Sequence, residues 1–319
     1  MTFFQKHGFT ILKWLIFAVS LLFLVYHIAS HQDFRTAFSK LNLLKFSDIY
    51  LLVAVFALMF ANWGIEAAKW RYAISGIRKI SFKRAFAAVL AGISVSLFMP
   101  NRTGEFVGRI FALPPGERIR SISASVVASF SQLLITVFCG TIALFIYYYF
   151  YPKNTLTEYG ISLWIQIPAS FITLLLLLIY FKIQWFTFLF EKWRFLQKYS
   201  EITQILKTYN TTILINFLLI SFLRYSVFII QFYLLLIFFG VELTFVNNIL
   251  ATVLTFYIMA IIPTFTLTEI GIRGSVVIIF FGFFSDSYTG IISASTLLWL
   301  INIGVPAFIG NIFIARFKE

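Results

Sequence analysis

The chain has 319 residues, of which 61% are hydrophobic and 20% aromatic, while only 12% are charged. Soluble domains are about half apolar and about a quarter charged, so this composition excludes an ordinary soluble protein and predicts a polytopic membrane protein. The formal net charge of +13 then indicates basic loops that face the cytoplasm and anionic headgroups. Nucleic-acid binding is not expected, since no basic soluble domain presents this charge.

Cysteine and histidine usage argues against redox chemistry and against a bound metal. Cys139 is the single cysteine and lies in an apolar run, where it permits no disulfide within the chain. His7, His27 and His31 lack partners at a metal-ligand spacing. We therefore expect no cofactor and no metal site.

Apolar runs close to membrane-crossing length predict about six transmembrane helices. A helix needs roughly 20 apolar residues to cross the hydrocarbon core, and the runs that suit this length are 9–29, 48–65, 121–150, 161–181, 211–239 and 288–314. The segment 183–209 instead repeats apolar residues at helical spacing between basic residues, which favours an amphipathic helix on the cytoplasmic membrane surface. A cytoplasmic extension of the preceding span is the alternative.

Two further apolar runs, 85–99 and 246–262, are too short to cross and are followed by prolines. Each suits a half-span that enters the membrane and turns back, because buried non-helical backbone is tolerated where it lines a cavity. The sequence therefore predicts two re-entrant hairpins, whose hinge and turn residues are Pro100, Gly104, Pro263 and Gly271.

The hairpins belong to a predicted repeat of about 48–120 and 211–284. Each half contains a spanning helix, a hydroxyl residue before a phenylalanine, a short helix, a proline and Glu-x-x-x-Arg. The linker 76–84 is rich in lysine and arginine, whereas its counterpart 240–248 has no basic residue. The positive-inside rule places these linkers on opposite sides, which predicts an inverted repeat of the kind found in alternating-access transporters. We expect one transmembrane domain, 1–319, in the cytoplasmic (inner) membrane with both termini in the cytoplasm.

Charged residues within these segments are the predicted binding residues, because ionisable groups in lipid usually line a cavity or a pathway. Arg102, Glu105 and Arg109 have spacings of three and four, which would place them on one helical face. Guanidinium groups bind phosphate well. The expected substrate-binding residues are Asn101, Arg102, Glu105, Arg109, Arg224, Glu269 and Arg273.

Each of these residues has a structural alternative. The arginines of the first motif could flank an ordinary cytoplasmic loop, and Glu269 with Arg273 could form a structural ion pair within its hairpin. Arg224 could either reach the cavity or pair with an acid. Glu66, Lys69 and Arg71 are interpreted as residues that flank the end of a span.

The two motifs resemble those of the flippase-like transmembrane domain of lysylphosphatidylglycerol synthases. The first resembles that family's Pro-x-Arg-x-Gly-Glu-x-x-Arg-like motif, through Pro100, Arg102, Gly104, Glu105 and Arg109. The family's second motif resembles Pro-x-x-x-Gly-x-Gly-x-Arg-Glu. Pro263, Gly271 and Arg273 fit it, whereas Glu269 replaces its first glycine and Gly274 its final glutamate.

This resemblance implies a translocator of lipids with charged or glycosylated headgroups, such as aminoacylated phosphatidylglycerol, polyprenyl-linked sugars or hopanoids. We therefore expect a lipid flippase that is not an enzyme and whose partners are membrane lipids. An intramembrane lipid-modifying enzyme is the first alternative, although the few aspartates are dispersed, whereas magnesium sites need clustered carboxylates. A scaffold or regulator of a separate lipid synthase or glycosyltransferase is the second.

Overall fold

The computed structural model of the protein describes residues 48–97, 99, 102–151, 163–192, 200–262 and 266–317. Within these ranges the structure is helical and contains no strand, which confirms an all-α polytopic membrane protein. The predicted first span, 9–29, lies outside the described residues. The described helices that are long and apolar enough to cross a membrane are Ile49–Ala73, Pro115–Phe150, Trp164–Phe181, Thr211–Phe238 and Tyr288–Ile314.

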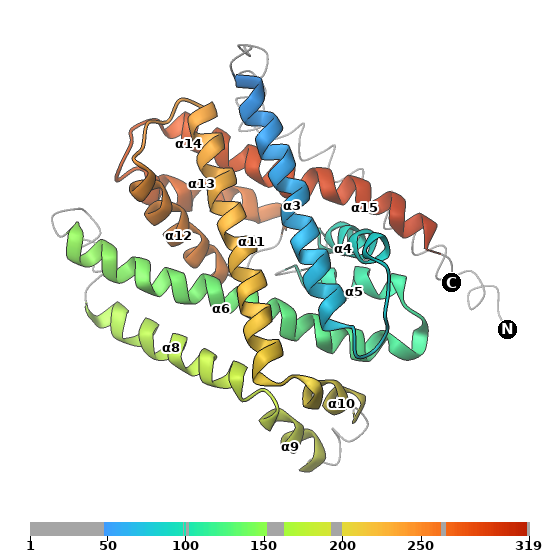
Figure 1. The fold of residues 1–319 in the computed structure, drawn as a ribbon. Coiled ribbons are helices and arrows are strands. Elements are labelled where there is room, and N and C mark those ends of the chain that lie inside the picture. Colours follow the sequence, from blue (N-terminus) through green and yellow to red (C-terminus); the bar gives the residue numbers. More distant parts are fainter. Residues whose placement is uncertain are drawn as a thin grey trace.

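Two long helices, α3 (Ile49–Ala73) and α11 (Thr211–Phe238), form the centre of the bundle. They pack against each other and run in opposite directions (Figure 1). The expected end of the first of these spans at residue 65 is wrong, since α3 continues to Ala73. In the additional turns Glu66 and Lys69 are buried inside the bundle, whereas Arg71, in the last turn, is exposed.

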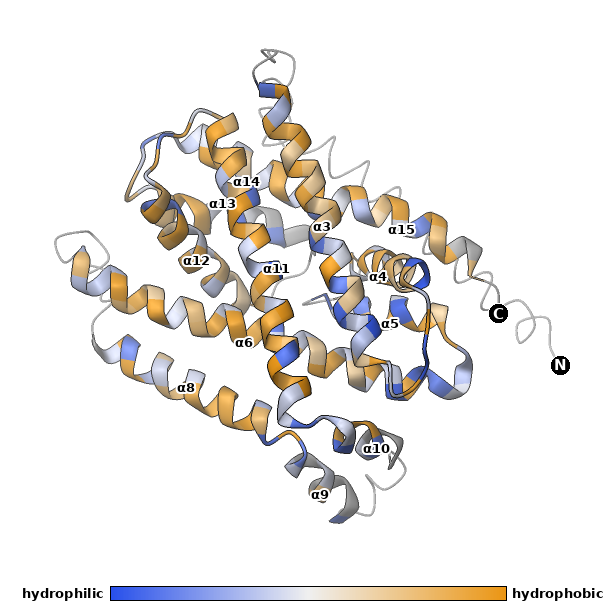
Figure 2. Ribbon diagram, in the orientation of Figure 1, coloured by the Kyte–Doolittle hydropathy of each residue, from blue (hydrophilic) through white to orange (hydrophobic). Residues whose placement is uncertain are grey.

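The remaining long helices surround this pair. Helices α6 (Arg118–Phe150) and α8 (Leu163–Phe181) lie side by side (Figure 1). The last span consists of α14 (Tyr288–Trp299), the π-helical turn η6 (Leu300–Gly304) and α15 (Val305–Arg316). Figure 2 shows these helices as largely apolar, whereas polar residues gather around α5 and in the connections near α10.

Two pairs of shorter helices occupy the regions where hairpins are predicted. They are α4 (Phe82–Ser96) with α5 (Gly104–Arg109), and α12 (Phe245–Ile261) with α13 (Thr266–Phe281). The hydroxyls of Ser81 and Thr244 cap the first helix of each pair by accepting a backbone N–H at 3.3 Å, which satisfies a donor that the helix itself leaves free. The predicted hinge residues Pro100 and Pro263 lie outside the described residues.

The segment 183–209 does not form the single amphipathic helix that its pattern predicts. It contains α9 (Trp185–Lys192) and α10 (Ser200–Thr208), and a turn at 182–184 separates α9 from α8. The apolar face of α10 packs on the bundle, and the Tyr209 hydroxyl donates to the Ala73 carbonyl at 3.0 Å. Packing on the bundle thus holds the last described part of the segment against the end of α3. Two short 3₁₀ helices, η3 (Ile110–Ala112) and η4 (Pro115–Glu117), join α5 to α6.

Glycines bring α4 and α5 into backbone contact. A Cβ at Gly104 would lie 2.6 Å from the Ser96 Cα, and one at Gly108 would lie 2.5 Å from the Ala91 carbonyl oxygen. Small residues allow such close approach of helices in membranes. The second motif differs, because a Cβ at Gly271 or at Gly274 would meet nothing within 4 Å. Glycines therefore allow close helix contact in the first pair of short helices but not in the second.

Replacing Gly108 by alanine should lower the free energy of unfolding by about 1–3 kcal/mol, because the new methyl group overlaps backbone that cannot move aside. Gly274→Ala is the matched control. It adds the same methyl group to a helix with free space and should instead stabilise that helix by up to about 1 kcal/mol. Thermal unfolding of the two purified variants in detergent checks that one substitution lowers the stability and the other raises it. Equal shifts would contradict the close packing of α4 on α5.

Candidate functional site

Helix α3 carries a buried polar face into the centre of the bundle. Asn62, Glu66 and Lys69 are spaced by four and three residues and therefore lie on one side of the helix. All three are buried, with Glu66 only 2% exposed. The interpretation of Glu66 and Lys69 as residues flanking a span end is therefore wrong, because α3 continues past them and its neighbours supply partners for their charges.

The Glu66 carboxylate binds three cations. Its Oε1 accepts from Arg109 Nη2 at 2.9 Å, and its Oε2 lies 3.0 Å from Lys69 Nζ and 3.2 Å from Arg224 Nη1. Arg109 also pairs with Glu105, one helical turn earlier in α5, at 3.0 Å. Buried charges are tolerated when they are paired and hydrogen-bonded. These five residues, named here the Glu66 cluster, connect α3, α5 and α11.

A chain of buried amides extends from this cluster to the last span. Arg224 Nε donates to Asn62 Oδ1 at 2.8 Å, and Asn62 Nδ2 donates to Asn302 Oδ1 at 3.0 Å. Asn302 Nδ2 in turn donates to Gln231 Oε1 at 2.9 Å. Asn302 lies in the π-helical turn η6, and such turns are frequent at functional sites. The amide chain therefore ties the charged centre to the junction between α14 and α15.

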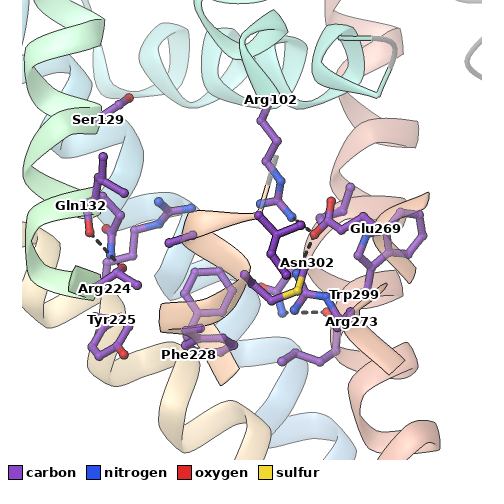
Figure 3. Close-up of a pocket in the computed structure, with 18 of the residues that line it drawn as sticks. Arg102, Ser129, Gln132, Arg224, Tyr225, Phe228, Glu269, Arg273, Trp299 and Asn302 are labelled. Carbon is purple, nitrogen blue, oxygen red and sulfur yellow. Dashed lines mark hydrogen bonds and ion pairs between the residues drawn. The ribbon is translucent and has the colours of Figure 1, made fainter. Parts of the chain in front are cut away.

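A second carboxylate, that of Glu269, joins the two hairpins. Its Oε1 accepts from Arg102 Nη2 at 2.7 Å and from Arg273 Nη2 at 2.6 Å (Figure 3). Arg102 has a backbone φ of 57° and precedes α5, a left-handed conformation that is uncommon for a residue other than glycine. Arg102 is therefore not on a common helical face with Glu105 and Arg109, and that expectation is wrong. The break before α5 directs Arg102 across to α13.

These side chains border a cavity of about 610 Å³ between the hairpins and the long helices. Figure 3 shows Arg102 reaching toward Glu269. Arg273 lies on the same side of the cavity as Glu269, and Arg224 lies on the opposite side. The Arg224 guanidinium also lies over the ring of Trp63, 4.9 Å from its centroid. Three guanidinium groups and one carboxylate therefore form the charged part of this wall.

The rest of the cavity wall is largely apolar. Phe106, Phe228, Phe256 and Met259 border it. The most exposed lining side chains include Val126 at 47% and Leu133 at 38%, both on α6. The cavity thus combines an inner cationic region with an edge that is apolar where it reaches the surface of α6.

The predicted substrate-binding residues divide into two groups. Arg102, Arg224, Glu269 and Arg273 border the cavity. Glu105 and Arg109 instead belong to the Glu66 cluster, where Arg109 is fully buried. Asn101 lies outside the described residues. Both alternatives for Arg224 hold, since it pairs with an acid and also borders the cavity.

The central residues of this hydrogen-bonded network are not among the predicted substrate-binding residues. Glu66, Asn62 and Asn302 carry most of its hydrogen bonds. The spacing of Asn62, Glu66 and Lys69 on one face was an available signal, because a polar stripe within an apolar helix faces protein rather than lipid. In the described part of the chain, no group of three or more histidine, cysteine, aspartate and glutamate residues could hold a metal ion.

Fold and site together define a polytopic α-helical membrane protein with an arginine-lined internal cavity. The chain matches the family model described as Lysylphosphatidylglycerol synthase TM region over residues 10–310, so it belongs to this family. This membership confirms the resemblance seen in its two motifs and indicates a membrane protein connected with lipids. A comparison with curated proteins gives no match.

Proposed function

We propose that this protein is a lipid flippase, which moves a lipid with a charged or glycosylated headgroup across the cytoplasmic membrane. The observation that carries the proposal is the cavity, in which Arg102, Arg224 and Arg273 lie behind an apolar edge on α6. Such a wall suits an amphiphile whose anionic headgroup binds arginines while its chains remain in an apolar medium. Family membership supports a lipid substrate.

In this proposal, the headgroup competes with Glu269 for its two arginines. Arg102 and Arg273 share a single carboxylate oxygen of Glu269. A phosphate offers several oxygens to the same donors and binds a guanidinium group through two parallel hydrogen bonds. Substrate binding would thereby replace the ion pair that links the two hairpins, and the hairpins could then move apart.

The packing of the repeats supports alternating access. The corresponding helices α3 and α11 are antiparallel, so their following linkers lie at opposite ends of the bundle (Figure 1). Helix α4 of the first repeat packs against α15, which follows the second repeat. Helix α12 of the second repeat packs against α6, which follows the first. Reciprocal contacts of this kind are expected of an inverted repeat, whose halves rock about a central site.

The proposal is tested with Arg102→Gln/Arg273→Gln, which keeps a polar side chain at both positions and removes two cavity charges. Transport of fluorescent phospholipids in proteoliposomes should fall by about tenfold or more, and a lipid enriched on the wild type in native mass spectrometry should be lost. Lys182→Gln/Lys192→Gln is the matched control, since both lysines are exposed on α8–α9. It should leave transport and lipid retention unchanged.

Three other results would contradict a flippase. Identical lipid content in the wild type and the cavity variant would remove the evidence for a headgroup site. Chemical conversion of the added lipid would favour the intramembrane enzyme. Lipid movement that occurs only after addition of a lipid synthase or glycosyltransferase would favour the scaffold.

A further inference from the structure

The buried and part-buried charges around the cavity do not balance. The Glu66 cluster and the Glu269 group together contain five cationic side chains, which are Lys69, Arg102, Arg109, Arg224 and Arg273. Among the residues that the structure describes, the carboxylates that pair with them are those of Glu66, Glu105 and Glu269. Excess charge buried away from water is unfavourable unless a counter-charge accompanies it. A bound anion with two negative charges would therefore balance the charges of the described site.

All three carboxylates are already paired. Glu66 binds three cations, Glu105 binds Arg109, and Glu269 binds two arginines through one oxygen. Within the described residues that border the cavity, no carboxylate is left for an ammonium group. An amine headgroup would instead lie among three guanidinium groups, and like charges repel most strongly where water is excluded.

Buried polar groups without a hydrogen-bond partner also lie on the cavity wall. The buried Nε of Arg273 has no hydrogen-bond partner and can donate to an anion. The Oε1 of Gln132 also lies buried on the cavity wall without a partner.

We propose that the substrate is a lipid with a doubly charged phosphate headgroup, either a phosphomonoester or a diphosphate. Aminoacylated lipids, whose ammonium groups cancel or exceed the phosphate charge, are excluded by the same cavity. A phosphomonoester carries about −1.5 to −2 charges near neutral pH, which matches the excess at the site. This inference rests on the proposed function, since it names the lipid class that the flippase takes.

Affinities of short-chain lipids for the purified protein test this inference. Dioctanoyl phosphatidate, dioctanoyl phosphatidylglycerol and dioctanoyl lysyl-phosphatidylglycerol share the same chains and differ in headgroup charge, and geranylgeranyl diphosphate supplies the diphosphate arm. We expect phosphatidate or the diphosphate to bind about tenfold more tightly than phosphatidylglycerol. If phosphatidate binds more tightly than the diphosphate, the headgroup is a phosphomonoester, and the reverse order indicates a diphosphate. Lysyl-phosphatidylglycerol should show no measurable binding.

A charge variant links the ranking to the cavity. Arg273→Gln removes one positive charge beside Glu269 and should reduce the preference for phosphatidate over phosphatidylglycerol to about threefold or less. Lys192→Gln makes the same change on an exposed part of α9 and should preserve the tenfold preference. If Arg273→Gln does not fold, the order of lipid affinities measured on the wild-type protein still tests the inference.

The outcomes separate this inference from the proposed function. Binding of lysyl-phosphatidylglycerol as tight as that of phosphatidate would overturn the inference, and the flippase would stand if that lipid moved in proteoliposomes. Equal affinities for phosphatidate, the diphosphate and phosphatidylglycerol would also overturn it. A preference for the doubly charged lipids without movement of any lipid would support the charge assignment and contradict the flippase.

Discussion

Replacing Glu66 by glutamine is expected to lower the free energy of unfolding by about 3–5 kcal/mol, the cost found when a buried ion pair loses one partner. The carboxylate binds Lys69, Arg109 and Arg224 at 2.9–3.2 Å. Guanidinium groups keep their protons in proteins, so two buried arginines would lose a counter-charge at once. Three helices meet at this carboxylate, and the loss should therefore affect the whole bundle.

Thermal unfolding in detergent measures this effect. Glu117→Gln is the matched control, because it makes the same chemical change at an ion pair with Arg78 in which the side chains are 22% and 43% exposed. Exposed pairs contribute at most about 1 kcal/mol. A Glu66→Gln variant as stable as Glu117→Gln would mean that the buried cations do not depend on this carboxylate. Partial recovery by an added anionic lipid would be expected, since the cavity lies beside Arg224.

Replacing Glu269 by glutamine should strengthen the binding of phosphate-bearing lipids by about tenfold and slow their transport. The carboxylate holds Arg102 and Arg273 at 2.7 and 2.6 Å, and hydrogen bonds to charged groups contribute about 1.5–3 kcal/mol each. A neutral amide competes less well with phosphate for these arginines. Tighter binding should delay release, because nothing then displaces the headgroup from the site.

Lipid affinity and transport rate, measured on the same preparation, check this prediction. Glu117→Gln is the matched control, since Glu117 also pairs with an arginine, Arg78, at 3.2 Å, but belongs to neither group of charges and does not border the cavity. Its lipid affinity should stay within about twofold of the wild type. Weaker binding by Glu269→Gln would show that the carboxylate positions the arginines rather than competing for them.

The sequence by itself determined the class of protein and the positions of its main elements. Apolar length predicted the described spans, and the two short runs correspond to α4 and α12. The high cost of charge in lipid also identified Arg102, Arg224, Glu269 and Arg273, which all border the cavity. These features are local, since each follows from composition or from spacing along one helix.

Only the tertiary structure decided which charges meet. Arg102 and Glu269 are 167 residues apart in the chain, and Arg109 and Glu66 are 43 apart. Spacing rules describe pairs within one helix, so Glu105–Arg109 and Glu269–Arg273 were visible whereas the central role of Glu66 was not. The close approach of α4 and α5 at Gly104 and the left-handed backbone of Arg102 set these longer contacts. Because a buried charge takes the partner that helix packing brings within reach, this pairing is a property of the fold.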